Sequence, residues 1–162
     1  MKSKAQAESL FVYFRDSIFI LQSAIQHYRN GEEIYYRVAA LQLRLLLCDT
    51  VHRHNRMEDI SLLPNIFPDC KLPPISPEGL PGKGVSLPLV EWLNLPLCSL
   101  EGDCIPIRDF IRRVCDQDGG AHVDLKPVAG LSAFPSRAEI IIHIAELVCL
   151  TTGALPSNFG FS

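Results

Sequence analysis

Proline is concentrated in one segment of this chain, and its distribution limits where helices can form. Proline breaks helix interiors and is rejected by central strands. Long helices are therefore expected only before and after this segment. Nine of the twelve prolines lie between residues 57 and 106: Pro64, Pro68, Pro73, Pro74, Pro77, Pro81, Pro88, Pro96 and Pro106.

An antiparallel pair of long helices is predicted over residues 4–56, before the proline-rich segment. The first ends at Asn30 and Gly31, which form a typical C-terminal cap, and the second opens at Glu32 and Glu33. A short Asn-Gly link predicts a helical hairpin. The first helix carries an apolar stripe at helical spacing: Leu10, Phe11, Phe14, Ile18, Leu21, Ile25 and Tyr28.

The second helix of the hairpin is apolar nearly all round. This pattern indicates a helix at the centre of the core or at a subunit contact. Its main stripe is Ile34, Val38, Leu41, Leu45 and Cys48, widened by Tyr35, Leu43, Leu46 and Leu47.

Residues 107–153 predict two further helices. The first has one apolar and one charged face, and ends at Gly119 and Gly120. Its apolar residues are Ile107, Phe110, Ile111, Val114 and Cys115, and its charged residues are Arg108, Asp109, Arg112, Arg113 and Asp116. The last helix begins after Ser136, which forms a capping box with Glu139. Its apolar face is Ile140, Ile141, Ile144, Leu147, Val148 and Leu150.

The proline-rich excursion over residues 57–106 is rich in leucine, so we expect an ordered loop region that wraps the helices. Within it Val85–Leu89 and Leu95–Leu100 could be short strands, and Glu101–Asp103 could be a turn, so the region can hold a short β-hairpin. Glu91–Asn94 fits one helical turn. The predicted fold is thus mainly α, in a single domain over residues 1–162: a helical hairpin, two further helices and a long ordered loop region.

The charge and the composition of the chain argue against several classes of protein. The net charge of −3 gives no global attraction to nucleic acid, and no apolar run is long enough to cross a membrane. The first residues lack the features of a signal peptide, so we expect a cytoplasmic protein. In that compartment the six cysteines are not expected to form disulfides, although Cys98 and Cys104 flank a tight loop and could approach each other.

The strongest candidate site follows the double glycine. His122 and Asp124, with Asp116 and Asp118, could form an acid/base pair or hold a divalent cation. The alternative is a helix-ending loop, in which His122 bonds a backbone carbonyl and the aspartates cap nearby amides. In the same way Arg112 and Arg113, with Arg108, could bind phosphate or could be paired with Asp109 and Asp116.

Two stretches together resemble known proteins: YYRVAALQLRLLLCD on the second helix and IRRVCDQDGGAHVD near residue 122. They are similar to small bacterial helical proteins of unassigned function, and more distantly to the HEPN superfamily. HEPN domains are helical bundles, often dimeric, and many cleave RNA without metal. Their motif is an arginine that is followed, after four to six residues, by a histidine. The resemblance implies that His122 is this histidine. Eight residues separate Arg113 from His122, and the positions at the family spacing hold Cys115, Asp116 and Gln117.

Three functions follow as hypotheses. The first is a non-catalytic interaction or regulatory domain that associates with itself or with a protein partner through its apolar helices. The second is a HEPN-like ribonuclease of a defence or toxin–antitoxin system. There His122 would be the acid/base or phosphate ligand, with Arg113 or Arg112 stabilising phosphate charge and Asp124 nearby. The third is a metal-dependent hydrolase using Asp116, Asp118, His122 and Asp124. No organic cofactor is expected, because the chain lacks a P-loop and a dinucleotide fingerprint.

Overall fold

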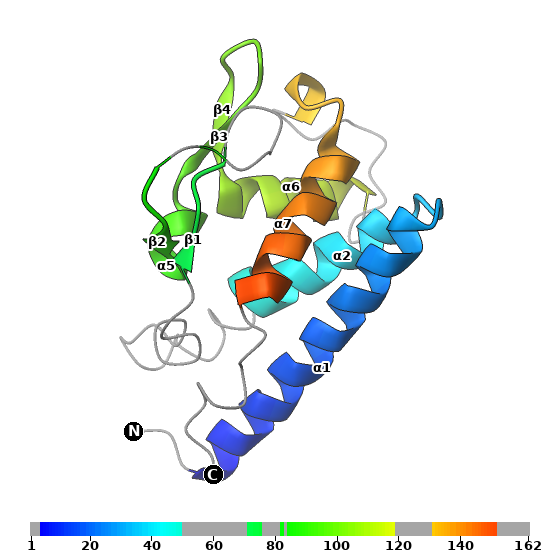
Figure 1. Cartoon of the computed structure of the whole chain (residues 1–162), viewed down its shortest axis with the longest axis vertical. Coiled ribbons are helices and arrows are strands. Elements are labelled where there is room, and N and C mark those ends of the chain that lie inside the picture. The colour runs from blue at the N-terminus through cyan, green and yellow to red at the C-terminus, as the bar shows by residue number, and fades with distance from the viewer. Residues whose placement is uncertain (1–3, 50–70, 76–81, 83, 119–130, 152–162) are drawn as a thin grey trace.

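The computed structural model describes residues 4–49, 71–75, 82, 84–118 and 131–151, and these are mainly helical (Figure 1). Helix α1 (Lys4–Arg29) and helix α2 (Tyr35–Leu43) form the predicted hairpin, and α2 continues as a π-helical segment, η1 (Arg44–Asp49). Helices α6 (Ile107–Asp118) and α7 (Arg137–Thr151) are the two further helices of the prediction. The expected extension of the second helix to residue 56 lies outside the described residues.

The turn between α1 and α2 is fixed at the predicted Asn-Gly pair. Gly31 has φ 98°, a left-handed conformation that glycine adopts without a side-chain clash. The amide of Gly31 donates to the carbonyl of Tyr28 at 3.0 Å. Across the turn the ring of His27 stacks on Tyr35, with centroids 4.3 Å apart, and its Nδ1 lies 2.7 Å from a carboxylate oxygen of Glu32. These contacts align the end of α1 with the start of α2.

Helix α2 buries a different face from the one that its main apolar stripe suggested. Ile34, Val38 and Leu41 are exposed, and Leu45 is half-buried. Ala39 and Ala40 lie on the side of α2 that faces the core, where their small side chains allow the neighbouring helices α1, α6 and α7 to approach closely. The buried residues of α2 and η1 are Ala39, Ala40, Leu43, Leu46 and Leu47.

The described part of the proline-rich segment holds two small antiparallel sheets. Strand β1 (Lys71–Leu72) pairs with β2 (Leu87–Pro88), and β3 (Pro96–Cys98) pairs with β4 (Cys104–Pro106). The short helix α5 (Leu89–Leu93) lies between β2 and β3, where one helical turn was predicted. Trp92 of α5 is fully buried, and its indole N–H donates to the carbonyl of Pro73 at 2.9 Å. An apolar helix therefore anchors this segment to the core.

The β3–β4 hairpin corrects the expectation that the cysteines are unbonded. Cys98 and Cys104 are directly paired in the register of the hairpin, with Cα atoms 4.1 Å apart, and they form a disulfide. Spacing along the chain had suggested only that they could approach. Cys115 and Cys149 are not part of a disulfide: Cys115 is buried, as its place on the apolar face of its helix predicted, and Cys149 is half-buried.

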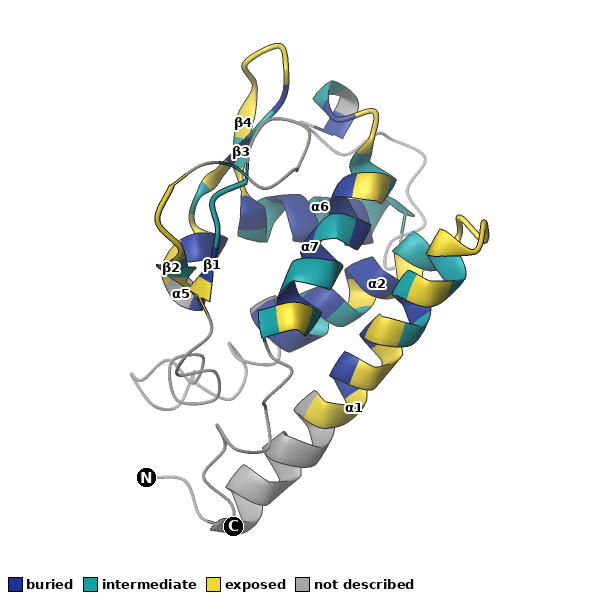
Figure 2. Ribbon diagram, in the orientation of Figure 1, coloured by how far each residue is buried: buried dark blue, intermediate teal, exposed yellow. Residues whose placement is uncertain are grey.

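The core is centred on α2, which packs against α1, α6 and α7 (Figures 1 and 2). Helix α7 packs on both helices of the hairpin and buries Ile140, Ile141, Ile144 and Val148. Leu150 was expected on the same face but is 79% exposed, since α7 has apolar residues on more than one side. No helix among the described residues is both long and apolar enough to cross a membrane.

Candidate functional site

Helix α6 has the two faces that its sequence predicted. All five residues of its apolar face are fully buried, and Phe110 packs edge-on against Phe134 with ring centroids 5.3 Å apart. Arg108, Arg112 and Arg113 lie on the other face and are half-buried. The amide of Ile107 donates to the carbonyl of Leu95 at 2.9 Å, which ties the first residue of α6 to the start of the β3–β4 hairpin.

At its last residue α6 presents a carboxylate to another helix. Arg137, the first residue of α7, donates from Nη2 to Oδ1 of Asp118 at 3.2 Å, and its Nε donates to Oδ2. The side chain of Asp118 is only 9% exposed. Guanidinium and carboxylate groups match in such a two-point contact. This ion pair therefore joins the end of α6 to the beginning of α7.

Tyr36 of α2 completes this cluster. Burial by itself raises the pKa of Asp118, but hydrogen bonds from Arg137 and Tyr36 outweigh it, so the pKa lies below its usual value. The pKa of Tyr36 is raised, chiefly by burial, and that of Arg137 is raised by its hydrogen bond to Asp118. Asp118 is thus held as a carboxylate at neutral pH.

Asp116 is also bound by an arginine from another element. Its Oδ1 accepts a hydrogen bond from Arg44 of η1, and the two side chains are 31% and 22% exposed. The four-residue spacing along α6 had suggested a partner on the same helix. Both carboxylates that precede the double glycine therefore have arginine partners, which disfavours their use as ligands of a divalent cation.

The structure tests only part of the site that the sequence predicted. His122 and Asp124 lie outside the described residues. Arg112 and Arg113 lie on the charged face of α6, and neither makes the ion pair to Asp118. Within the described ranges, no three histidine, cysteine or carboxylate side chains come together in a way that could hold a metal ion. Sequence reasoning missed Tyr36, Arg44 and Arg137, because nothing in their local pattern points to Asp116 or Asp118.

A second candidate is the exposed apolar stripe of α2. Ile34 is 67% exposed, Val38 37% and Leu41 38%. Their spacing of four and three residues places them on one face of the helix. Phe19 and Ile20 of α1 are exposed as well, at 72% and 40%. Contiguous exposed apolar side chains are typical of interaction sites, whereas single ones are normal on any surface.

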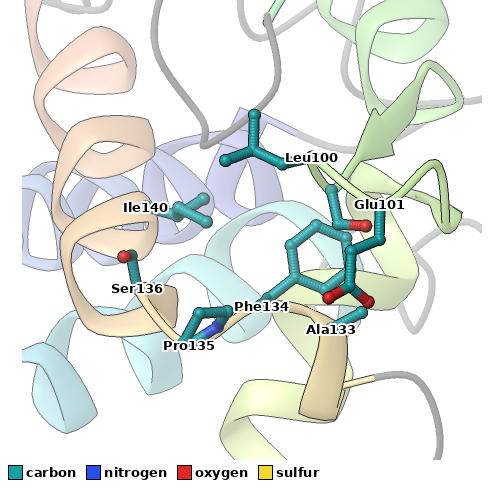
Figure 3. A pocket seen from close by; sticks show the side chains of 8 residues that line it. Leu100, Glu101, Ala133, Phe134, Pro135, Ser136 and Ile140 are labelled. Atoms are coloured by element: carbon teal, nitrogen blue, oxygen red, sulfur yellow. The ribbon is translucent and has the colours of Figure 1, made fainter.

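A small cavity lies between the tip of the β3–β4 hairpin and the start of α7 (Figure 3). Its volume is about 200 Å³, below the roughly 300–1,000 Å³ of pockets that hold drug-sized ligands. It therefore does not suit a nucleotide or a similar cofactor. Nothing in the sequence predicted it. The lining side chains are those of Ser99, Leu100, Glu101, Ala133, Phe134, Pro135, Ser136 and Ile140.

A shallow groove between α1 and α7 contains the thiol of Cys149. Burial raises the pKa of this thiol to about 11, and the nearby carboxylate of Glu146 adds to the effect. The thiolate, which is the nucleophilic form, is therefore scarce at neutral pH. Cys149 does not have the environment of a catalytic cysteine.

Comparison with known proteins adds no assignment. No protein-family model matches the chain, and neither the curated proteins nor the solved structures include a match to it. The candidate sites therefore depend on their geometry and chemistry alone.

Proposed function

We propose that the chain is a helical interaction domain that associates with itself. The observation that carries this proposal is the apolar stripe of Ile34, Val38 and Leu41, which folding leaves accessible to water on α2. Burial of apolar surface contributes about 25 cal/mol per Å², so a complex in which a second protein surface covers the stripe would be stabilised. A non-catalytic role also fits the arginine partners of Asp116 and Asp118, which make these carboxylates structural.

Sedimentation of the purified chain over a range of concentrations tests self-association. We expect the average mass to rise from that of one chain to that of two as the concentration increases through the micromolar range. The association should persist in high salt, because contact between apolar surfaces is not screened as ion pairs are. A mass of one chain at every concentration would contradict the proposal.

A HEPN-like ribonuclease is the second candidate, and the position of Arg137 favours it. Asp118 lies four residues before His122 in the sequence, and Arg137 meets the chain at Asp118. Arg137 therefore places a guanidinium at the last described residue before the glycine pair, whereas eight residues separate Arg113 from His122 in the sequence. The test is RNA cleavage in the presence of a chelator, followed by the same assay on His122→Ala. Activity that survives this substitution, or that the chelator abolishes, would reject this candidate.

A cytoplasmic location is also part of the proposal, and the Cys98–Cys104 disulfide gives a way to test it. Reducing compartments keep most cysteine pairs as thiols, whereas secreted proteins keep them bonded. Blocking free thiols in intact cells before lysis would show the state of the two sulfurs. A pair found fully bonded would argue for an oxidising compartment, and a pair found as thiols would support the cytoplasm.

A further inference from the structure

Two walls from distant parts of the chain enclose the small cavity of Figure 3. One wall is the tip of the β3–β4 hairpin, and the other runs from the end of η3 (Leu131–Ala133) to the first residues of α7. The cavity has a volume of about 200 Å³. A cavity of about 150 Å³ holds one benzene molecule, so this cavity has room for a molecule slightly larger than a single benzene ring.

Hydrogen bonds within the chain hold both walls in place. At the hairpin tip the amide of Ser99 donates to the carbonyl of Asp103 at 2.8 Å, and the amide of Asp103 donates to the hydroxyl oxygen of Ser99 at 3.2 Å. The other wall is built on Phe134, whose amide donates to the carbonyl of Leu131 at 2.9 Å. A cavity whose walls are already ordered binds a ligand without the entropic cost of ordering them.

Most of the side chains that line this cavity are apolar. Figure 3 shows the ring of Phe134 between Ile140 on one side and Glu101 on the other, with Leu100 at the top of the view. Phe134 and Ile140 are nearly fully buried, at 2% and 1% exposure. An apolar lining with a few polar groups is typical of sites for small ligands. Phe134 and Ile140 therefore offer a surface for the apolar part of a ligand.

Glu101 is the only charged side chain among the described residues that line the cavity. It is exposed, and it makes no ion pair within the part of the chain that the structure describes. Arg137 follows the lining residue Ser136, but its guanidinium is bound to Asp118. The negative charge of Glu101 is therefore uncompensated at the cavity, where it attracts a cation and repels an anion.

Two hydroxyl groups add hydrogen-bond acceptors to the cavity. Ser99 is only 6% exposed, and its Oγ accepts one hydrogen bond, from the amide of Asp103. A hydroxyl oxygen has two lone pairs, so one of them remains for a ligand. Ser136 lies on the opposite wall, and its hydroxyl makes no hydrogen bond among the described residues. Both walls can therefore accept hydrogen bonds from a ligand with N–H groups.

We propose that this cavity binds a small organic amine. The ammonium group of the amine, which has three N–H donors, binds the carboxylate of Glu101 and the hydroxyl of Ser99 on the hairpin wall. The apolar part of the amine, about the size of one benzene ring, packs on Phe134 and Ile140. The cavity uses no residue of the α2 stripe, so this binding does not depend on the proposed self-association.

Titration of the isotope-labelled chain with benzylamine, followed in amide NMR spectra at pH 7 without reductant, tests the site. Benzyl alcohol has nearly the same shape as benzylamine but no charge, and benzoate carries the opposite charge. We expect saturable shifts of the amide signals of Leu100, Glu101 and Phe134, with a dissociation constant of about 1 mM for benzylamine. Benzyl alcohol should bind about fivefold more weakly, because it lacks the exposed ion pair with Glu101. Benzoate should not bind measurably.

Glu101→Gln removes the charge and keeps the shape of the side chain. In this variant benzylamine should bind as weakly as benzyl alcohol, whose own affinity should not change. Glu91→Gln is the matched control, because Glu91 is exposed on α5 and does not line the cavity. The absence of saturable shifts at the lining residues would overturn the site. Benzyl alcohol or benzoate binding as tightly as benzylamine, or an unchanged benzylamine affinity in Glu101→Gln, would overturn the amine as its ligand. None of these outcomes bears on self-association, which sedimentation measures.

Discussion

Replacement of Arg137 by alanine removes the partner of a carboxylate that water reaches poorly. The loss of one partner from a fully buried ion pair costs about 3–5 kcal/mol, and an exposed pair contributes about 0–1 kcal/mol. The side chain of Asp118 is 9% exposed and that of Arg137 is 29% exposed, so this pair lies between the two cases. We expect the free energy of unfolding to fall by about 2 kcal/mol at pH 7.

The loss of stability in Arg137→Ala should become smaller as the pH falls. The pKa of Asp118 is lowered in the folded chain, so its stabilising effect is present above about 3.9, the pKa of an unfolded aspartate, and disappears as the pH falls through the folded value. In Arg137→Ala, burial of Asp118 is no longer outweighed by this guanidinium. The carboxyl group of Asp118 is therefore protonated at a higher pH in the variant than in the unchanged chain, and protonation removes the cost of burying its charge.

Urea unfolding of both chains at pH 7 and pH 4 measures these differences. Arg15→Ala is the matched control, since Arg15 pairs with Asp16 at 3.4 Å and both side chains are more than half exposed. This control should change stability by no more than about 0.5 kcal/mol. A loss of stability in Arg137→Ala that is no larger than in Arg15→Ala, or that is the same at both pH values, would show that Arg137 does not stabilise a buried carboxylate.

Three further changes test other contacts. Trp92→Phe removes the indole donor to the carbonyl of Pro73 and should cost about 1–3 kcal/mol, measured by thermal unfolding followed by circular dichroism. Cys98→Ser with Cys104→Ser opens a loop of only six-residue separation, so stability should fall by about 2 kcal/mol or less and the far-ultraviolet spectrum should not change. Arg29→Ala removes two ion pairs from α1 to α7, each with a 2.5 Å contact but half exposed. Its cost of about 0.5–1 kcal/mol should decrease in high salt, and an equal cost at all salt concentrations would contradict an ionic origin.

Helices with one clear apolar face could be predicted from the sequence. The five apolar residues of α6 recur at helical spacing among charged ones, and all five are buried. The end of α1 could be predicted because Asn30 and Gly31 interrupt the helix with a turn that favours glycine. In both places the local pattern and the tertiary packing agree.

The buried face of α2 could not be predicted in the same way. A helix that is apolar on nearly every side offers no contrast between its faces. Ile34, Val38 and Leu41 are the larger residues, but the smaller Ala39 and Ala40 are buried, since they let neighbouring helices approach closely. The same face also buries Leu43, Leu46 and Leu47, which are as large as the exposed Leu41, so neither size nor apolar character identifies the buried face from the sequence.

Contacts between distant residues were also beyond the sequence. Arg44 lies 72 residues from Asp116, and Arg137 lies 19 residues from Asp118. The pairing of Cys98 with Cys104 depends on the register of a hairpin whose second strand begins at Cys104, where the sequence indicated only the end of a turn. Each contact follows from how the elements meet, so local spacing could not identify it.

The disulfide at the base of the β3–β4 hairpin makes residues 99–103 a closed ring on the surface. A protease that cut beside Leu100, whose side chain is 75% exposed, would produce two fragments that migrate as one species until a reductant is added. For the same reason the ring is a suitable place to insert a peptide tag or a fluorescent label. The amide of Ile107 stays bound to Leu95 outside the ring, so such an insertion would leave α6 in its place.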